Sequence, residues 1–193
     1  MSKKSKQTAV VISQEKLAEG IYDLWIETGL AKEAGAGQFI GVYPKNAATL
    51  LPRPISICEV NEERMALRLV YRVAGKGTTE FSSLKKDDRI EILGILGNGY
   101  RVPELLTGHP EFTEITLYGG GIGIPPMLQL SKELAAAGRK PSVFLGYRDS
   151  HLFLKEDFEK YSKVYVATED GSIGTKGNVL TALSESGLQP SVM

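Results

Sequence analysis

The sequence predicts a β-barrel followed by a Rossmann-like α/β half, and two patterns along its 193 residues indicate this order. Up to about residue 100, short runs of alternating apolar and polar residues are separated by Gly, Pro, Asn or Asp, which is typical of antiparallel strands. From about residue 112, strand-like and helix-like runs alternate, as in a doubly wound parallel sheet. We therefore expect a six-stranded antiparallel barrel in residues 1–103 and a Rossmann-like parallel-sheet domain in residues 112–193.

Six segments carry the strand pattern of the expected barrel. They are Gln7–Ser13, Ile21–Thr28, Gln38–Tyr43, Arg53–Val60, Met65–Arg72 and Arg89–Leu93. A short polar turn-helix is expected at about Thr78–Leu84. Six short strands predict a small closed barrel, because closure removes exposed sheet edges.

The second half alternates strand and helix patterns after a linker. The expected linker is Arg101–Glu111, which contains two prolines and a glycine. After it we expect a strand at Glu114–Tyr118, a glycine turn at Gly119–Ile124, a helix at Pro125–Ala137, a strand at Ser142–Tyr147, a helix near Phe153–Tyr161 and a strand at Lys163–Ala167. This alternation predicts a parallel sheet with helices packed on it.

Composition limits the function classes. Lys plus Arg and Asp plus Glu both number 23, so bulk charge gives no support for nucleic-acid binding. The single cysteine, Cys58, excludes an intrachain disulfide and fits a reducing, cytoplasmic setting. No apolar run approaches the ~20 residues that a membrane helix needs.

A glycine-rich turn, Gly119-Gly-Gly-Ile-Gly-Ile-Pro-Pro126, follows the first strand of the second half and opens its helix. Glycines let the backbone approach a pyrophosphate, and a helix N-terminus offers free N–H groups and a favourable dipole. The segment departs from G-x-G-x-x-G, because a proline stands where the third glycine would sit. We expect dinucleotide binding here, and the alternative is a turn that serves packing alone.

A second motif, Arg53-Pro-Ile-Ser56, begins a strand of the expected barrel. Pro52 and Pro54 flank Arg53 and limit the directions of its guanidinium. A planar fork of donors suits a pyrophosphate, and Ser56 could hydrogen-bond a ring nitrogen. A solvated arginine is the alternative, but the position of the motif before a nucleotide-binding half favours a binding role.

Separated motifs together resemble one family. Arg53-Pro-Ile-Ser56, Gly75-Lys-Gly-Thr78 and the glycine turn are similar to the ferredoxin–NADP reductase superfamily. More closely, the chain resembles the electron transfer subunits of bacterial dihydroorotate dehydrogenase in Leu69-Val-Tyr-Arg72, Leu96-Gly-Asn-Gly-Tyr100 and Asp170-Gly-Ser-Ile-Gly174. The motifs occur in the family's order, and the resemblance covers nearly the whole chain.

The resemblance implies that the barrel has Greek-key connectivity and binds FAD, and that the second domain binds NAD(H). The implied FAD contacts are Arg53, Pro54, Ile55, Ser56, Val70, Tyr71, Arg72, Gly77 and Thr78. The implied NAD contacts are Gly119, Gly120, Gly121, Ile122, Gly123, Asp149 and Asp170. Because hydride transfer between the cofactors depends on positioning, no catalytic acid or base is expected.

The choice between NAD and NADP stays open at one loop. Asp149 could accept hydrogen bonds from a ribose 2′-hydroxyl, whereas the adjacent Arg148 could accommodate a 2′-phosphate. The resemblance favours NAD, and a solvated loop is the alternative for both residues.

The chain departs from the family at its cysteines. The family carries a downstream cysteine cluster for a [2Fe–2S] centre, but four thiolates are needed and the chain has one cysteine. The resemblance therefore implies a portion of a longer protein, with an incomplete second domain and no metal ligands of its own, and the alternative is a natural variant without the cluster.

The expected function is FAD-mediated electron transfer between NAD(H) and a partner, the FMN-containing catalytic subunit of dihydroorotate dehydrogenase, in a heterotetramer that serves pyrimidine biosynthesis. No nucleic-acid or membrane partner is expected. One alternative is a subunit of a related NAD(P)H–ferredoxin oxidoreductase or sulfide dehydrogenase. Another, of a different class, is a cofactor-free regulatory or scaffold module.

Overall fold

The computed structural model describes residues 5–46, 50–109 and 114–188, and its contacts divide the chain into two units, residues 1–99 and 100–193. The domain limits 1–103 and 112–193 stay predictions. Within the described ranges, no helix is both long and apolar enough to cross a membrane.

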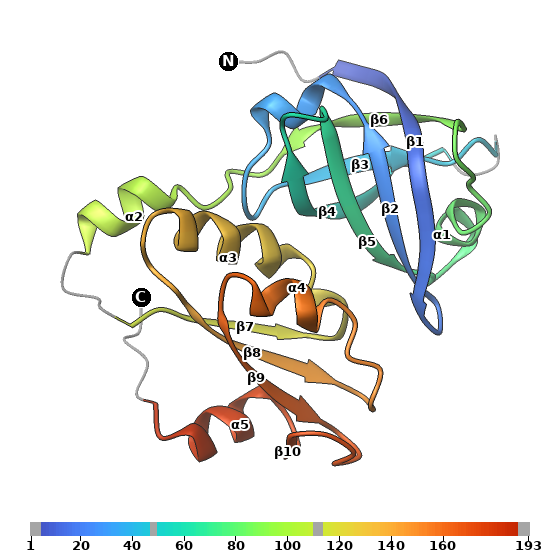
Figure 1. Cartoon of the computed structure of the whole chain (residues 1–193). Coiled ribbons are helices and arrows are strands. Elements are labelled where there is room, and N and C mark those ends of the chain that lie inside the picture. The colour runs from blue at the N-terminus through green and yellow to red at the C-terminus, as the bar shows by residue number, and fades with distance from the viewer. Residues whose placement is uncertain (1–4, 47–49, 110–113, 189–193) are drawn as a thin grey trace. The chain divides into compact units, whose positions relative to one another are not determined.

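The first unit is a closed barrel of six antiparallel strands (Figure 1). Its elements are β1 (Ser5–Ala18), β2 (Ile21–Glu27), η1 (Gly29–Glu33), β3 (Phe39–Tyr43), β4 (Arg53–Asn61), β5 (Ala66–Arg72), α1 (Lys76–Phe81) and β6 (Arg89–Leu96). The strands follow the order β1-β2-β5-β4-β3-β6 around the barrel, so β2 pairs with β5, and β6 pairs with β1 to close the barrel. The expected barrel is confirmed, with β1 longer than predicted and α1 beginning before its predicted start at Thr78.

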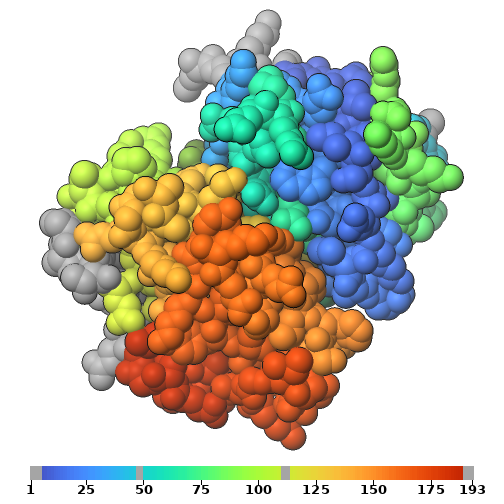
Figure 2. Space-filling model, in the orientation of Figure 1, coloured from blue at the N-terminus to red at the C-terminus, as the bar shows by residue number. Residues whose placement is uncertain are grey.

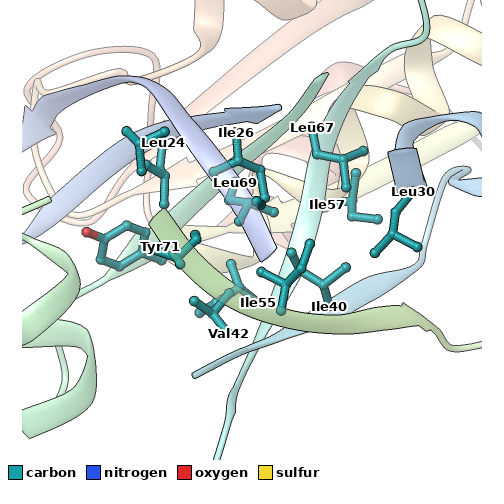
Figure 3. Close-up of a cluster of buried hydrophobic side chains, with 14 of the residues drawn as sticks. Leu24, Ile26, Leu30, Ile40, Val42, Ile55, Ile57, Leu67, Leu69 and Tyr71 are labelled. Carbon is teal, nitrogen blue, oxygen red and sulfur yellow. The ribbon is translucent and has the colours of Figure 1, made fainter. Parts of the chain in front are cut away.

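Alternation along the strands fills the barrel with aliphatic side chains. Leu24 and Ile26 on β2 lie against Leu67 and Leu69 on β5, and all four are almost fully buried (Figure 3). Tyr71 lies at one end of this cluster and directs its hydroxyl oxygen away from the aliphatic residues. The core therefore holds the strands in register, while the ends of β4 and β5 carry the residues of the predicted FAD site.

The second unit is a four-stranded parallel sheet in the order β10-β9-β8-β7, with helices on both faces. Its elements are α2 (Val102–Gly108), β7 (Thr116–Gly120), η2 (Gly121–Gly123), α3 (Pro126–Ala136), β8 (Ser142–Tyr147), α4 (Lys155–Glu159), β9 (Lys163–Thr168), β10 (Thr175–Lys176) and α5 (Val179–Ser186). Figure 1 shows α3 and α4 on one face and α5 on the other, and residues of α3 and α4, yellow-orange and orange, lie on the outer surface in Figure 2.

Aromatic rings line the sheet beneath α5. Phe144 is fully buried and stacks on Tyr118 at 5.5 Å and on Tyr165 at 4.6 Å, measured between ring centroids. Val179 and Leu183 of α5 pack against this row. Strands β7, β8 and β9 are thereby tied together through side chains as well as through their backbone ladder.

Some elements differ from the sequence-based expectations. Residues of the predicted linker Arg101–Glu111 form helix α2, in which Pro103 occupies the first turn, where its missing N–H has no helical partner. The helix predicted near Phe153–Tyr161 is shorter, because Leu154 adopts a left-handed conformation immediately before α4. Neither β10 nor α5 was predicted, although Asn178 caps α5 and Gly187 ends it.

Candidate functional site

The segment Arg53–Ser56 opens strand β4 and alternates between the barrel interior and its surface. Ile55 is buried in the core, so its side chain is not available to a ligand, whereas Pro54 and Ser56 are exposed. Arg53 is half-buried and donates a hydrogen bond from Nη1 to the carbonyl of Leu51 at 3.0 Å. The arginine thus leaves the barrel in a fixed direction at the edge of the core.

Helix α1 provides the surface on which Arg53 lies. A Cβ atom added to Gly77 would fall 2.8 Å from Nε of Arg53, 3.2 Å from its Cγ and 3.1 Å from Cγ of Pro44. Such distances are shorter than ordinary van der Waals contact, so any side chain at this position would displace the arginine stem. Two residues far apart in the sequence that were both predicted to contact FAD are therefore in direct contact.

Thr78 shapes the turn before α1. Its hydroxyl donates to the carbonyl of Gly75 at 3.0 Å and accepts the N–H groups of Ala74 at 2.9 Å and Gly75 at 3.2 Å. The side chain is buried. These bonds fix the conformation of the loop Ala74–Gly77, and a role of the same hydroxyl in binding phosphate stays a prediction.

Tyr71 points into the barrel, while its neighbour Arg72 is exposed. The ring stacks on Tyr22 with centroids 5.8 Å apart and meets Phe81 edge-on at 6.1 Å. Burial raises the pKa of the Tyr71 hydroxyl far above its usual range, so this group stays protonated. A ligand on this strand could therefore meet the backbone of Tyr71 but not its ring.

The glycine turn lies at the carboxyl end of β7, directly before α3. A Cβ added to Gly119 would lie 2.9 Å from Cα of Ile124, so this glycine is required for packing the turn. Above Gly120 and Gly123, by contrast, no atom lies within 4 Å of an added Cβ. Two of the glycines thus leave open space where a ligand could approach the backbone.

Asp149 and Asp170 lie in the loops that follow two neighbouring strands, β8 and β9. The backbone N–H of Asp170 donates to the carbonyl of Arg148, which joins the loops. Asp149 Oδ1 accepts the N–H of His151 at 2.9 Å and lies 2.7 Å from its Nδ1, and these contacts hold the pKa of Asp149 below its usual range. Hydrogen bonds from Ser172 likewise lower the pKa of Asp170. Both predicted carboxylates are therefore ionised and near each other.

Sequence reasoning missed Thr168, which closes the loop after β9. Its fully buried hydroxyl donates to the carbonyl of Ile173 at 2.8 Å and accepts the N–H of the same residue at 3.2 Å. Gly174 follows with a φ of +69°, and an added Cβ would lie 2.2 Å from the carbonyl oxygen of Val166. A threonine at the end of a strand, followed by two turn glycines, is the signal that could have identified this rigid loop.

Strand β7 ends the sheet, and beside it lies an apolar pocket of about 320 Å³. Among the described residues no strand pairs with the outer edge of β7. The pocket is lined by Tyr100, Leu105, Ile115, Thr116, Leu117, Tyr118, Met127, Leu130 and Leu134. The outer edge of β7 therefore presents backbone N–H and C=O groups with which no described strand pairs.

An iron–sulfur cluster does not fit the residues present. Cys58 is buried and is the only cysteine in the sequence, whereas such a cluster needs four thiolates. Within residues 5–46, 50–109 and 114–188, no group of three or more His, Cys, Asp or Glu side chains could hold a metal ion.

Comparison with known proteins identifies relatives over most of the chain. The electron transfer subunit of dihydroorotate dehydrogenase B (NAD(+)) from Streptococcus pneumoniae is 37% identical over 180 residues, which are 93% of this chain and 69% of the relative. The subunit of the same name from Enterococcus faecalis is 38% identical over 184 residues, with 94% and 68% covered. No protein-family model matches the chain.

A solved structure supports the same conclusion. The structure of an NADH-dependent reduced ferredoxin–NADP oxidoreductase, described in work on flavin-based electron bifurcation, superposes with a TM-score of 0.79 at 29% identity. The match covers 92% of this chain and 62% of that one, so the chain spans less than two thirds of the solved protein. With its barrel, its parallel sheet and its relatives above, the chain belongs to the family of electron transfer subunits of dihydroorotate dehydrogenase B.

Proposed function

We propose that this chain is the FAD- and NAD(H)-binding part of an electron transfer subunit that exchanges electrons between NAD(H) and a catalytic partner that interconverts dihydroorotate and orotate in pyrimidine biosynthesis. The observation that carries the proposal is the contact between Gly77 and Arg53. A glycine that makes room for an arginine stem beside a strand end is a cradle suited to a pyrophosphate.

The barrel residues would bind FAD through three groups of contacts. The guanidinium of Arg53 would pair with the pyrophosphate, which its rigid fork of donors fits. The exposed Ser56 would hydrogen-bond the isoalloxazine ring, and the backbone of β5 from Val70 to Arg72 would lie beside ring and ribose. FAD, when bound, can accept a hydride from a reduced nicotinamide and release the two electrons one at a time.

The second unit would bind the nicotinamide cofactor at the carboxyl edge of its sheet. The open backbone at Gly120 and Gly123 would receive the pyrophosphate at the start of α3, and Asp149 and Asp170 would lie toward the adenosine. These residues bind and orient, and none donates or abstracts a proton in the hydride step, so the rate would depend on positioning.

The proposed partner is the FMN-containing catalytic subunit of dihydroorotate dehydrogenase, in a heterotetramer. The relatives are named electron transfer subunits, which supports a partner of this kind. The [2Fe–2S] centre of the family would be held by cysteines outside this chain. We also propose a cytoplasmic location, which suits a single buried cysteine, Cys58, that has no cysteine in the chain with which to form a disulfide.

The visible absorption spectrum of the purified protein tests the proposal. Flavin absorption bands at about 370 and 450 nm, with FAD released on denaturation, are the expected result. Addition of NADH without oxygen should then bleach these bands. A protein that stays colourless after incubation with excess FAD would contradict the proposal and favour the cofactor-free scaffold.

A second candidate is a subunit of a related NAD(P)H–ferredoxin oxidoreductase, which the 29% identity to the solved oxidoreductase favours. The two candidates differ in the partner. Co-purification with a subunit that oxidises dihydroorotate would support the first, and reduction of a ferredoxin in place of orotate formation would support the second.

Gly120→Ala tests whether the glycine turn approaches a ligand. Because the backbone of Gly120 is extended and no atom lies within 4 Å of an added Cβ, folding stability should change by less than about 0.5 kcal/mol. NADH affinity should nevertheless fall by about tenfold or more, as the methyl group would hold the pyrophosphate away from the backbone. Isothermal titration and thermal denaturation measure the two effects. Unchanged NADH affinity would favour a turn that serves packing alone.

Asp149→Asn tests the preference for NADH. Loss of an ionised acceptor for the ribose hydroxyls should lower NADH affinity by about tenfold and leave NADPH affinity equal or higher. Because the pKa of Asp149 is lowered, its carboxylate should stay charged, and NADH affinity of the unaltered protein should stay level, as the pH falls from about 8 to about 5. The exposed neighbour Glu169, changed to Gln, is the matched control. An equal loss of NADH affinity in both variants would mean that the net negative charge of this loop, and not a specific contact of Asp149, is responsible.

A further inference from the structure

The side chain of Gln14 joins two parts of the barrel that are far apart in the sequence. Its Oε1 accepts a hydrogen bond from the Tyr71 hydroxyl at 2.9 Å. Its Nε2 donates to the carbonyls of Phe81 and Leu84, both at 3.0 Å. Carbonyls only accept hydrogen bonds and the amide nitrogen only donates, so these partners fix which way the amide points. One side chain on β1 thereby connects β5 to the C-terminal end of α1.

Gln14 adds a second donor to the carbonyl of Phe81 at this end of α1, which also accepts the N–H of Leu84 at 3.0 Å. The last carbonyls of a helix have no helical donor, and α1 has only six residues, so its own hydrogen bonds hold it weakly. Phe81 anchors the helix by packing into the core, and Glu80 accepts the backbone N–H groups of Lys45 and Asn46. Loss of the Gln14 hydrogen bonds would therefore shift α1 relative to the barrel, while Phe81 and Glu80 would keep it attached.

The position of α1 also sets the position of Arg53. Gly77, in the first turn of the helix, is so close to Nε and Cγ of Arg53 that there is no room for a Cβ. The other end of the guanidinium is held by the carbonyl of Leu51. Movement of α1 by a fraction of an ångström must therefore change where the guanidinium lies.

We propose that Gln14 is a positioning residue for FAD binding: it fixes α1, and through Gly77 it sets the direction of Arg53. The inference rests on the proposed function, since it assigns Arg53 to the pyrophosphate. Gln14 itself does not touch the cofactor in this proposal. Its effect on affinity must therefore pass through Arg53 and disappear when Arg53 is removed.

A double-mutant cycle tests the proposal. FAD affinity is measured by quenching of flavin fluorescence for the unaltered protein, Gln14→Met, Arg53→Ala and the double variant. Methionine keeps the length of the side chain without its hydrogen bonds. We expect Gln14→Met to lower FAD affinity by about tenfold in the unaltered protein and by less than about twofold in the Arg53→Ala background. Equal losses in both backgrounds, or no loss, would overturn the proposal.

Ile26→Val separates positioning from general loss of stability. Ile26 is fully buried in the barrel core on β2, so the shorter side chain should lower the thermal midpoint without moving α1. We expect its FAD affinity to stay within about twofold of the unaltered value. A loss of FAD affinity in Ile26→Val as large as that in Gln14→Met would mean that Gln14 acts only by stabilising the barrel.

A measurement without cofactor keeps this inference distinct from the proposed function. The NMR signal of the Arg53 Nε–H group should shift in Gln14→Met and stay in place in Ile26→Val. If the unaltered protein binds no FAD, the proposed function fails, and the Arg53 signal still decides whether Gln14 positions this side chain. An unshifted signal in Gln14→Met would contradict the proposal.

Discussion

Replacement of Gly77 by alanine is expected to lower FAD affinity by about 10- to 100-fold while the barrel stays folded. The added Cβ would fall 2.8 Å from Nε of Arg53, so the arginine stem must leave its place on α1. A charge-assisted pair with a pyrophosphate depends on the direction of the guanidinium and is lost when the stem moves. Titration of the apoprotein with FAD measures the effect, and circular dichroism checks the fold.

Gly75→Ala is the matched control. Gly75 lies immediately before α1, its backbone is extended, and no atom lies within 4 Å of an added Cβ. Its FAD affinity should stay within about threefold of the unaltered value. Similar losses in both variants would mean that the loop, and not the arginine, decides affinity.

Gly174→Ala should destabilise the second unit by about 3 kcal/mol or more, the largest loss of stability expected here. The residue has a φ of +69°, which strains any side chain, and its Cβ would lie 2.2 Å from the carbonyl oxygen of Val166 in β9. Strand and loop would have to separate. Urea unfolding followed by circular dichroism measures the change, and tryptophan fluorescence of Trp25 reports on the barrel.

Gly187→Ala isolates the clash from the backbone strain. Gly187 has a φ of +71° at the end of α5 and open space around an added Cβ, so only strain remains, about 1 kcal/mol. If both variants lose the same stability, the contact with Val166 is not responsible. A fall in barrel stability as large as that of the sheet would also contradict the expectation.

The barrel could be predicted from the sequence because its signal is local. Alternation places Leu24 and Ile26 on one side of β2, and turn residues mark where each strand ends. Short-range patterns of this kind are sufficient for strand positions and for the glycine turn before α3. The order of strands around the barrel followed from resemblance to a family, not from alternation.

Contacts across the sequence could not be predicted. Nothing near Gly77 indicates that Arg53 lies on it, and nothing near Gln14 indicates that its amide reaches Phe81 and Leu84. Helix α2 was missed because prolines and glycine in Arg101–Glu111 indicated a linker, although a proline is compatible with the first turn of a helix. Periodicity identifies elements, whereas the site is made where elements meet.

The open edge of β7 has a consequence for the order in which the protein forms. The barrel closes on itself, so it can complete its hydrogen bonds as soon as its last strand leaves the ribosome. The sheet grows in chain order from β7 to β10, each strand adding beside the one made before it. Growth thus moves away from β7. No described strand pairs with the outer backbone groups of β7, which lie beside an apolar pocket. The nascent second unit therefore exposes a strand edge that the closed barrel lacks, and it is the half that most needs protection from other nascent chains.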